Sequence, residues 1–298
     1  MVISQVIGGL GNQMFQYAAG RALALRLGDD LALDVSAFEN YTLHQGFELT
    51  RVFAMSPAIA SGQELRRVLG WQHSPLVRSL LSRRPFAALR SRRFVSEPHF
   101  HHWSGFDQLG GDVYLAGYWQ SEKYFKPVFV QIREDFRFRL PLEGQNAELA
   151  DRLSQTQAVS LHIRRGDYAS NPKTTSTHGL CSLDYYHAAV AHVAGKVEKP
   201  EFFIFSDDID WVRANLPLNF PHHFVSHNQG AASYIDMRLM SLCSHHVIAN
   251  SSFSWWGAWL AGVDRADGGV VIAPRQWFAG PADKVGAADR FPSRWELL

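Results

Sequence analysis

The chain has 298 residues, of which 46% are apolar and 13% are aromatic. That length exceeds what a single hydrophobic core normally serves, so we expect two domains with a cleft between them. The formal net charge of +1 excludes a strong overall attraction to nucleic acid, and we expect no nucleic-acid partner. The two cysteines lie outside any metal-binding or redox pattern, which is typical of a reduced cytoplasmic protein.

A parallel α/β unit is predicted at the start of the chain. Residues 2–7 form an apolar run that ends in glycines, residues 12–27 have helical spacing up to Gly28, and residues 31–35 return to a strand pattern. The sequence has neither a signal-peptide pattern nor an apolar run of membrane-spanning length. We therefore expect a cytoplasmic protein whose N-terminal α/β domain covers residues 1–150.

The middle of the chain is less regular. Residues 51–112 lack a clear period and contain scattered prolines, so we interpret them as an irregular insertion in the N-terminal domain. Six arginines alternate there with apolar residues: Arg78, Arg83, Arg84, Arg90, Arg92 and Arg93. A solvated basic face is the simple interpretation, and peripheral contact with anionic lipid at the inner membrane is the alternative.

Residues 151–298 predict a second domain in which strands and helices alternate. The expected strands cover residues 158–163, 201–205, 222–225, 246–249 and 269–272, and the expected helices cover residues 183–197, 209–216, 231–244 and 253–261. This order predicts a doubly wound parallel sheet. Ligands of such sheets bind beyond the carboxyl ends of the strands, so the residues that follow each strand are the candidates for a site.

Two arginines follow the first strand of this second domain. Arg164 and Arg165 come after His162 and Ile163, and adjacent guanidinium groups are costly to hold together without an anion. A diphosphate is a suitable ligand, because a guanidinium group binds phosphate oxygens through two parallel hydrogen bonds. For Arg165, an ion pair with a nearby carboxylate such as Asp167 is an equally good interpretation.

The second strand ends in two aspartates and leaves two interpretations open. Asp208 and Asp210 match the DxD pattern by which many sugar-nucleotide enzymes hold a metal ion. Alternatively, Asp207 or Asp208 caps the following helix, while one of them accepts hydrogen bonds from a nucleoside. The first interpretation predicts that activity requires a metal ion, and the second predicts that it does not.

After the fourth strand, the polar residues Asn250, Ser251 and Ser252 lead into a predicted helix. The unpaired N–H groups and the positive dipole end at the start of a helix attract anions. We therefore expect these three residues to contribute to an anion site.

A glycine-rich turn follows the first strand of the chain. Gly9 and Gly11 allow a ligand to approach the backbone closely, and Asn12 and Gln13 bring polar side chains to the same place. Met14 occupies the position of the third glycine in a dinucleotide-binding fingerprint, so that motif is incomplete.

Five segments, taken together and in this order, resemble the α-1,2-fucosyltransferases of glycosyltransferase family 11, in their bacterial form. They are GGLGNQMFQYA at residues 8–18, GYWQSEKYF at 117–125, HIRRGDY at 162–168, FSDD at 205–208 and NSSFSWWGAWL at 250–260. The match spans nearly the whole chain. The combination is far more specific than any one of these strings.

This resemblance implies a GT-B-like fold, in which two Rossmann-like domains face each other across a cleft and residues 151–298 hold the donor. It implies inverting, metal-independent transfer of L-fucose from GDP-fucose to the 2-hydroxyl of a terminal galactose in a glycan, without a cofactor. Arg164 would bind the diphosphate, with His162 beside it, and would stabilise the charge that develops there. The remaining donor contacts implied are Asp208 to the nucleoside, Asp236 to guanine, and Ser251 and Ser252 to the phosphates.

A general base should deprotonate the acceptor hydroxyl. Asp34, at the end of the second predicted strand, and Glu97 are candidates, and a structural role is open for both. Two other functions stay open as well. One is a metal-dependent glycosyltransferase that uses Asp208 and Asp210, and the other is a non-catalytic protein that binds a GDP-sugar or a glycan.

Overall fold

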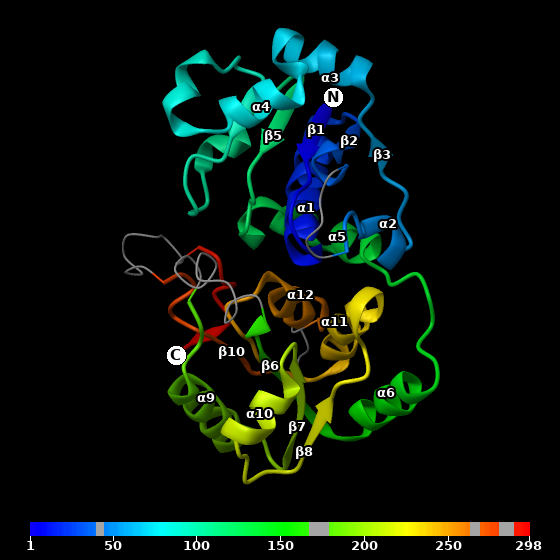
Figure 1. Cartoon of the computed structure of the whole chain (residues 1–298), viewed down its shortest axis with the longest axis vertical. Coiled ribbons are helices and arrows are strands. Elements are labelled where there is room, and N and C mark those ends of the chain that lie inside the picture. Colours follow the sequence, from blue (N-terminus) through cyan, green and yellow to red (C-terminus); the bar gives the residue numbers. More distant parts are fainter. Residues whose placement is uncertain (40–44, 167–178, 263–268, 280–288) are drawn as a thin grey trace. The chain divides into compact units, whose positions relative to one another are not determined.

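The computed structural model describes residues 1–39, 45–166, 179–262, 269–279 and 289–298, apart from the side chain of Arg84 (Figure 1). Contacts divide the chain into two compact units, Met1–Arg139 and Leu140–Leu298. The boundary expected from the sequence, after residue 150, falls inside helix α6 (Gln145–Gln155). Each unit contains a parallel sheet and helices, so the predicted α/β class is confirmed.

Unit 1 is built on a five-stranded parallel sheet in the order β3-β2-β1-β5-β4. Its strands are β1 (Val2–Gln5), β2 (Leu31–Asp34), β3 (Ala58–Ile59), β4 (Phe94–Ser96) and β5 (Val113–Ala116). Its α-helices are α1 (Leu10–Leu27), α2 (Leu49–Val52), α3 (Gly62–Leu69), α4 (Pro75–Leu81) and α5 (Phe129–Asp135). Short 3-10 helices lie between them, including η2 (Gly70–His73) and η3 (Arg84–Leu89).

Helix α1 packs closely against β1 and β2. The Ser4 hydroxyl donates to the carbonyl of Gln16 at 2.8 Å, which ties the strand to the middle of the helix. A Cβ atom on Gly20 would lie 2.9 Å from the side chains of both Ser4 and Leu31, so glycine permits this close approach. The helix ends where the sequence predicts, at Gly28, whose φ of 61° is left-handed.

Residues 51–112, which we interpreted as an irregular insertion, contribute to this sheet. They supply its two edge strands, β3 and β4, together with α3 and α4. Leu65, Val68 and Leu81 of these helices form one core with Ile3 and Tyr114 of the sheet. The two edge strands have only two and three residues, which is too short for a strand period to show in the sequence.

A buried ion pair joins α4 to the sheet. Arg78 and Asp34 are each 2% exposed, and Arg78 Nη2 lies 3.2 Å from Asp34 Oδ2. The Tyr114 hydroxyl donates to the same oxygen at 2.6 Å, and burial together with this carboxylate raises the pKa of Tyr114 well above its usual value. We expected Arg78 to belong to a basic face exposed to solvent or lipid, and this expectation is wrong. Arg78 is buried because Asp34 provides its countercharge inside unit 1.

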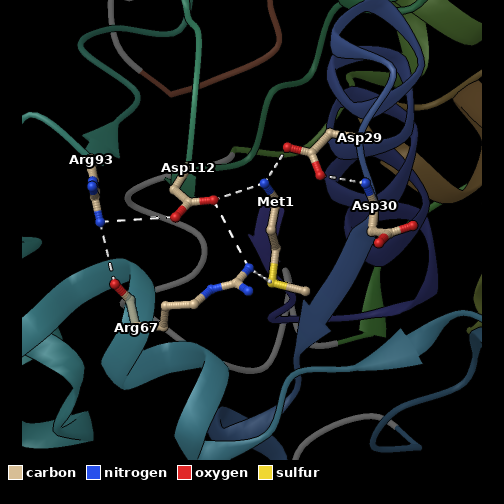
Figure 2. Close-up of polar contacts among 6 residues, drawn as sticks. All are labelled: Met1, Asp29, Asp30, Arg67, Arg93 and Asp112. Carbon is tan, nitrogen blue, oxygen red and sulfur yellow. Dashed lines mark hydrogen bonds and ion pairs between the residues drawn. The ribbon is translucent and has the colours of Figure 1, made fainter.

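A second charged cluster lies where strands begin (Figure 2). Asp112, directly before β5, accepts from the backbone nitrogen of Met1 at 2.8 Å and lies 3.9 Å from both Arg67 and Arg93. Asp29 accepts from the same nitrogen. The Arg67 and Arg93 side chains are 58% and 54% exposed, so solvent screens their attraction to Asp112.

Unit 2 contains a six-stranded parallel sheet in the order β11-β10-β9-β6-β7-β8. Its strands are β6 (Gln157–Ile163), β7 (Pro200–Ser206), β8 (His222–Val225), β9 (His245–Val247), β10 (Val271–Ala273) and β11 (Glu296–Leu297). Besides α6, its α-helices are α9 (Leu183–Lys196), α10 (Ile209–Asn215), α11 (Tyr234–Leu242) and α12 (Ser252–Leu260). None of the helices in the described ranges combines the length and apolar character needed to cross a bilayer.

The sheet of unit 2 is doubly wound, as predicted. From β6 the chain passes to β7 and β8 on one side, then returns to β9, β10 and β11 on the other (Figure 1). Tyr186 of α9 and Val212 of α10 pack in one core, whereas Leu153 of α6 and Met240 of α11 pack in another. The winding changes direction between β6 and β9, and doubly wound sheets bind their ligands at this point.

The buried ion pair gives a prediction about stability. Arg78→Ala should lower the free energy of unfolding of unit 1 by about 3–5 kcal/mol, because Asp34 would stay buried without its countercharge. Chemical denaturation followed by circular dichroism measures this loss. The exposed Arg92→Ala should change stability by less than about 0.5 kcal/mol, and Asp34→Asn combined with Arg78→Met should recover most of the loss. A loss below about 1 kcal/mol for Arg78→Ala would contradict the role of the pair.

Candidate functional site

The residues that follow β6, β7 and β9 gather at one edge of the unit 2 sheet. The strand register pairs Ile163 with Ser206 and Leu161 with Val247. Continued by one step, the β6–β7 register brings Arg164 level with Asp207, and Asn250 comes three residues after the end of β9, the other neighbour of β6. The carboxyl ends of parallel strands thus place the predicted arginine beside the predicted serine-rich loop.

Arg164 forms an ion pair across this edge. Its Nη1 atom lies 2.8 Å from Oδ2 of Asp207, and both side chains are about one quarter exposed (26% and 25%). The other carboxylate oxygen of Asp207 accepts from the backbone N–H of Arg165 at 2.8 Å. Asp207 therefore fixes both the Arg164 guanidinium and the backbone that follows it. The sequence had offered Asp207 only as a helix cap or a nucleoside contact.

Gly166 completes this turn. A Cβ atom at Gly166 would lie 2.4 Å from Oδ2 of Asp207, the oxygen that holds Arg164. Any larger residue must displace that carboxylate. Asp167 and Tyr168, the next residues of the HIRRGDY segment, lie outside the described residues.

Arg165 has a different environment from Arg164. Its guanidinium carbon lies 3.5 Å from the centre of the Trp211 ring, and its Nε lies 3.4 Å from Oδ2 of Asp208. The other oxygen of Asp208 accepts from the backbone N–H of Trp211 at 3.3 Å, which caps α10. Arg165 and Asp208, both predicted donor contacts, thus bind each other and the start of α10. The capping interpretation of Asp208 is confirmed.

His162 points a buried imidazole toward the same edge. Only 6% of the residue is exposed, and its ring centre lies 6.0 Å from that of Phe253 at the start of α12. Its Nδ1 atom has no hydrogen-bond partner among the described residues. Burial lowers the pKa of His162 to about 4, with Asp207 opposing the shift and Arg164 adding to it, so the ring is neutral at pH 7.

The loop before α12 is anchored from several sides. Asn250 is 2% exposed, and its side chain donates to the carbonyls of Gly179 and Trp277 at 3.3 and 3.2 Å. Ser251 caps α12 by accepting from the N–H of Phe253 at 3.3 Å, and Ser252 is the first residue of the helix. Asn250 thus holds the loop, while the first N–H groups of α12 are those suited to an anion.

Asp236 lies in the first turn of α11, the helix that follows β8. The Asn228 side chain donates to Asp236 Oδ1 at 2.8 Å. Burial raises the pKa of Asp236 to about 7, and the hydrogen bond from Asn228 only partly opposes this shift. A carboxyl group of this kind favours a ligand that brings its own hydrogen-bond donors.

In unit 1, the glycine-rich turn after β1 meets the loop after β5. Gly9 stands at the start of α1, Gly11 is buried, and Asn12 Oδ1 accepts from Gln120 at 2.6 Å. Gln13 is fully buried and donates to the carbonyls of Gly8 and Gly46 at 2.9 and 2.7 Å. It also accepts from the N–H of Glu48 at 2.9 Å. Gln13, which the sequence predicted as a donor contact, therefore holds the backbone of unit 1 together.

The two candidate bases both have structural partners. Asp34 is enclosed by Arg78 and Tyr114, as described above, so its burial argues against a direct role toward an acceptor. Glu97 accepts from the backbone N–H groups of Tyr118 and Trp119 at 2.7 and 3.1 Å, and Trp119 has a left-handed φ of 53°. Glu97 thus stabilises the turn after β5. Within the described ranges, no group of three or more metal-binding side chains occurs.

Comparison with known protein families identifies the family of this chain. The model of glycosyl transferase family 11 matches residues 1–297. The chain belongs to glycosyl transferase family 11. This confirms the family inferred from the sequence motifs, and the protein is a glycosyltransferase.

The chain is similar to three named transferases over most of its length. The chain is 37% identical over 297 residues to an alpha-1,2-colitosyltransferase of Escherichia coli, covering 99% of this chain and 98% of the relative. It is 33% identical over 290 residues to the O-antigen biosynthesis glycosyltransferase WbnK of Escherichia coli, covering 92% and 93%. It is 27% identical over 266 residues to galactoside alpha-(1,2)-fucosyltransferase 1 of Saimiri boliviensis boliviensis, covering 86% of this chain and 64% of the relative.

The crowding at Gly166 gives a prediction for this glycosyltransferase. Gly166→Ala should lower the transfer rate by about tenfold to a hundredfold, because Asp207 must move and release Arg164. Gly195→Ala is a matched control, since a Cβ there meets nothing within 4 Å, and it should keep full activity. Steady-state kinetics with circular dichroism as a check on folding tests both. Normal turnover by a folded Gly166→Ala enzyme would show that the Arg164–Asp207 geometry is not needed.

Proposed function

We propose that this enzyme transfers L-fucose from GDP-fucose to the 2-hydroxyl of a terminal galactose, with inversion and without a metal ion. The observation that carries the proposal is the Arg164–Asp207 pair at the switch point of the unit 2 sheet, two residues after His162, whose ring lies 6.0 Å from that of Phe253 at the start of α12. A guanidinium group held in one orientation suits a diphosphate, which is the group common to nucleotide sugars. The linkage is supported by two relatives whose names share the α-1,2 bond.

The chemistry needs groups that stabilise a leaving diphosphate. As the acceptor hydroxyl attacks C1 of fucose and gives up its proton to a general base, the bond from C1 to the diphosphate breaks and negative charge grows on the phosphate oxygens. Arg164 and the first N–H groups of α12 would take up this charge, and their anchors, Asp207 and Ser251, would keep them in place before the reaction. Neutral His162 would add a hydrogen-bond donor and no charge.

Asp236 is proposed to bind guanine. The N1–H and amino groups of guanine are two adjacent donors, which match the two oxygens of a carboxylate. Asp236 lies in the first turn of α11, and its hydrogen bond from Asn228 ties it to the segment directly after β8, which is two strands away from β6. A nucleoside diphosphate extended along this edge of the sheet would reach from Arg164 to Asp236.

A second candidate function is colitosyl transfer. The alpha-1,2-colitosyltransferase relative is more similar to this chain than the named fucosyltransferase is, at 37% against 27% identity. Colitose lacks the 3-hydroxyl of fucose. A site that binds this hydroxyl would discriminate strongly against a donor without it, whereas an apolar site would discriminate weakly.

A donor competition assay tests the proposed function. Purified enzyme, a galactose-terminated oligosaccharide and EDTA are incubated with GDP-fucose, with the colitosyl donor, or with both, and the product linkage is determined by NMR. We expect a fucosylated α-1,2 product at a rate that EDTA leaves unchanged. Transfer of colitose alone would favour the second candidate. Loss of activity in EDTA, restored by manganese, would overturn the metal-independent mechanism.

Arg164→Lys should lower both kcat and kcat/KM, by about 10²–10³, although the positive charge is kept. Lysine is a point charge that cannot reproduce the planar two-bond contact, and this contact strengthens as the diphosphate gains charge. The exposed Arg213→Lys, on α10, is the control and should retain turnover. Steady-state kinetics at saturating acceptor separates the two parameters. A well-folded Arg164→Lys enzyme with near-normal kcat would remove Arg164 from its proposed role.

GDP binding should depend on pH through Asp236. With a pKa of about 7, this carboxyl group is mostly protonated below pH 7 in the unliganded enzyme and then cannot accept from both guanine donors. GDP affinity should therefore rise with pH from about 6 to 7 and level off above pH 8. Asp236→Asn should bind GDP more weakly at pH 8 and lose this dependence. Calorimetric titrations from pH 5.5 to 8.5 measure both, and the same pH profile in the Asn variant would exclude Asp236.

A further inference from the structure

One stretch of unit 1 carries positive charge without any acidic residue. Between Glu64 and Glu97 the sequence has eight arginines and no aspartate or glutamate. The net charge of the whole chain is only +1, so this concentration is local. A partner for this stretch has to be anionic.

The same stretch exposes large apolar side chains. Trp71 of η2 is 66% exposed, Leu76 and Leu80 of α4 are 83% and 41% exposed, and Leu89 of η3 is 58% exposed. Leu76 and Leu80 are four residues apart and share one side of α4. Arg78 and Leu81, at 2% and 1% exposed, turn toward the core. Helix α4 therefore has a buried side and an apolar outer side.

Side-chain hydrogen bonds hold these segments together as one body, which we name the cap (residues 70–93). Gln72, 1% exposed, donates to the carbonyl of Leu89 at 2.8 Å and accepts from the N–H of Ser91 at 3.1 Å. Arg90 Nε donates to the carbonyl of Leu81 at 2.7 Å. These hydrogen bonds hold the backbone of the cap in place, so its exposed side chains project from a fixed surface. In Figure 1 the cap is the cyan part of unit 1 around α4.

The arginines of this stretch differ in how far they are neutralised. Arg78 is paired inside the core, and Arg67 and Arg93 share Asp112 at 3.9 Å (Figure 2). Arg83 and Arg92 are exposed, and they flank η3 with its exposed Leu89. The cap therefore combines apolar side chains with cations beside them.

We propose that the cap is a membrane-docking surface whose partner is a bilayer with anionic lipids. Trp71, Leu76 and Leu89 would enter the headgroup region, where tryptophan is favoured, and Arg83 and Arg92 would contact the lipid phosphates. Surfaces that bind nucleic acid are polar and basic, and four exposed apolar side chains do not suit them. The proposal concerns the location of the enzyme and is independent of its donor and acceptor.

Vesicle co-sedimentation of the full chain tests this proposal without any substrate. We expect binding to phosphatidylcholine vesicles that contain phosphatidylglycerol to be at least about tenfold tighter than to phosphatidylcholine alone. Arg83→Glu with Arg92→Glu should abolish this preference. Trp71→Ser with Leu76→Ser should weaken binding to both kinds of vesicle by about tenfold or more. Both variants should keep normal transfer to a soluble oligosaccharide, which shows that they are folded.

A matched control lies elsewhere in unit 1. Val130, 60% exposed, and Arg137, exposed beside Glu134, permit the variant Val130→Ser with Arg137→Glu, which should bind vesicles like the wild type. Equal sedimentation with neutral and acidic vesicles would overturn the proposal, as would an equal loss in the control variant. The proposal would also be overturned if the protein bound a short RNA but did not sediment with either kind of vesicle.

Discussion

The parallel direction of every strand in the unit 2 sheet is the constraint on which the site depends. Parallel strands bring all their carboxyl ends to one edge, so loops that are far apart in the sequence meet there. Arg164, Asp207 and Asn250 follow three different strands, yet these strands are neighbours in the sheet and end at the same edge. Once this arrangement exists, few further interactions are needed: a carboxylate to orient the arginine, a small residue to let it approach, and a capped helix beside them.

The sequence predicted much of this arrangement because its signals are local. Apolar runs predicted β1 and β2 in unit 1 and β6 and β7 in unit 2, and Gly28 marked a helix end, whereas β5 was not predicted. The prediction that Arg164 follows a strand end is confirmed for the same reason, since a strand end can be recognised from its own residues. β3 and β4 could not be found, because strands of two and three residues depend on their neighbours in the sheet.

The roles of individual polar residues were harder to predict, because they depend on contacts between distant segments. Asp34 and Arg78 are 44 positions apart, and neither sequence neighbourhood indicates that they neutralise each other. Gln13 looked like a ligand contact, yet its amide is taken up by the backbone near residues 8 and 46–48. A buried polar side chain needs hydrogen-bond partners. A polar residue in a motif therefore often bonds to the protein's own backbone and is not free to contact a ligand.

The acid-free stretch around α4 has a consequence for how unit 1 assembles. Its arginines repel one another and have no local carboxylate, so the segment gains nothing electrostatically by collapsing on itself. The countercharge for Arg78 is Asp34 on β2, and that carboxylate also receives the Tyr114 hydroxyl from β5. Three segments that are remote in sequence must therefore converge before this charge is stabilised. Such long-range closure is slow, so the α4 layer is expected to join a sheet that has already formed around β1, rather than to nucleate it.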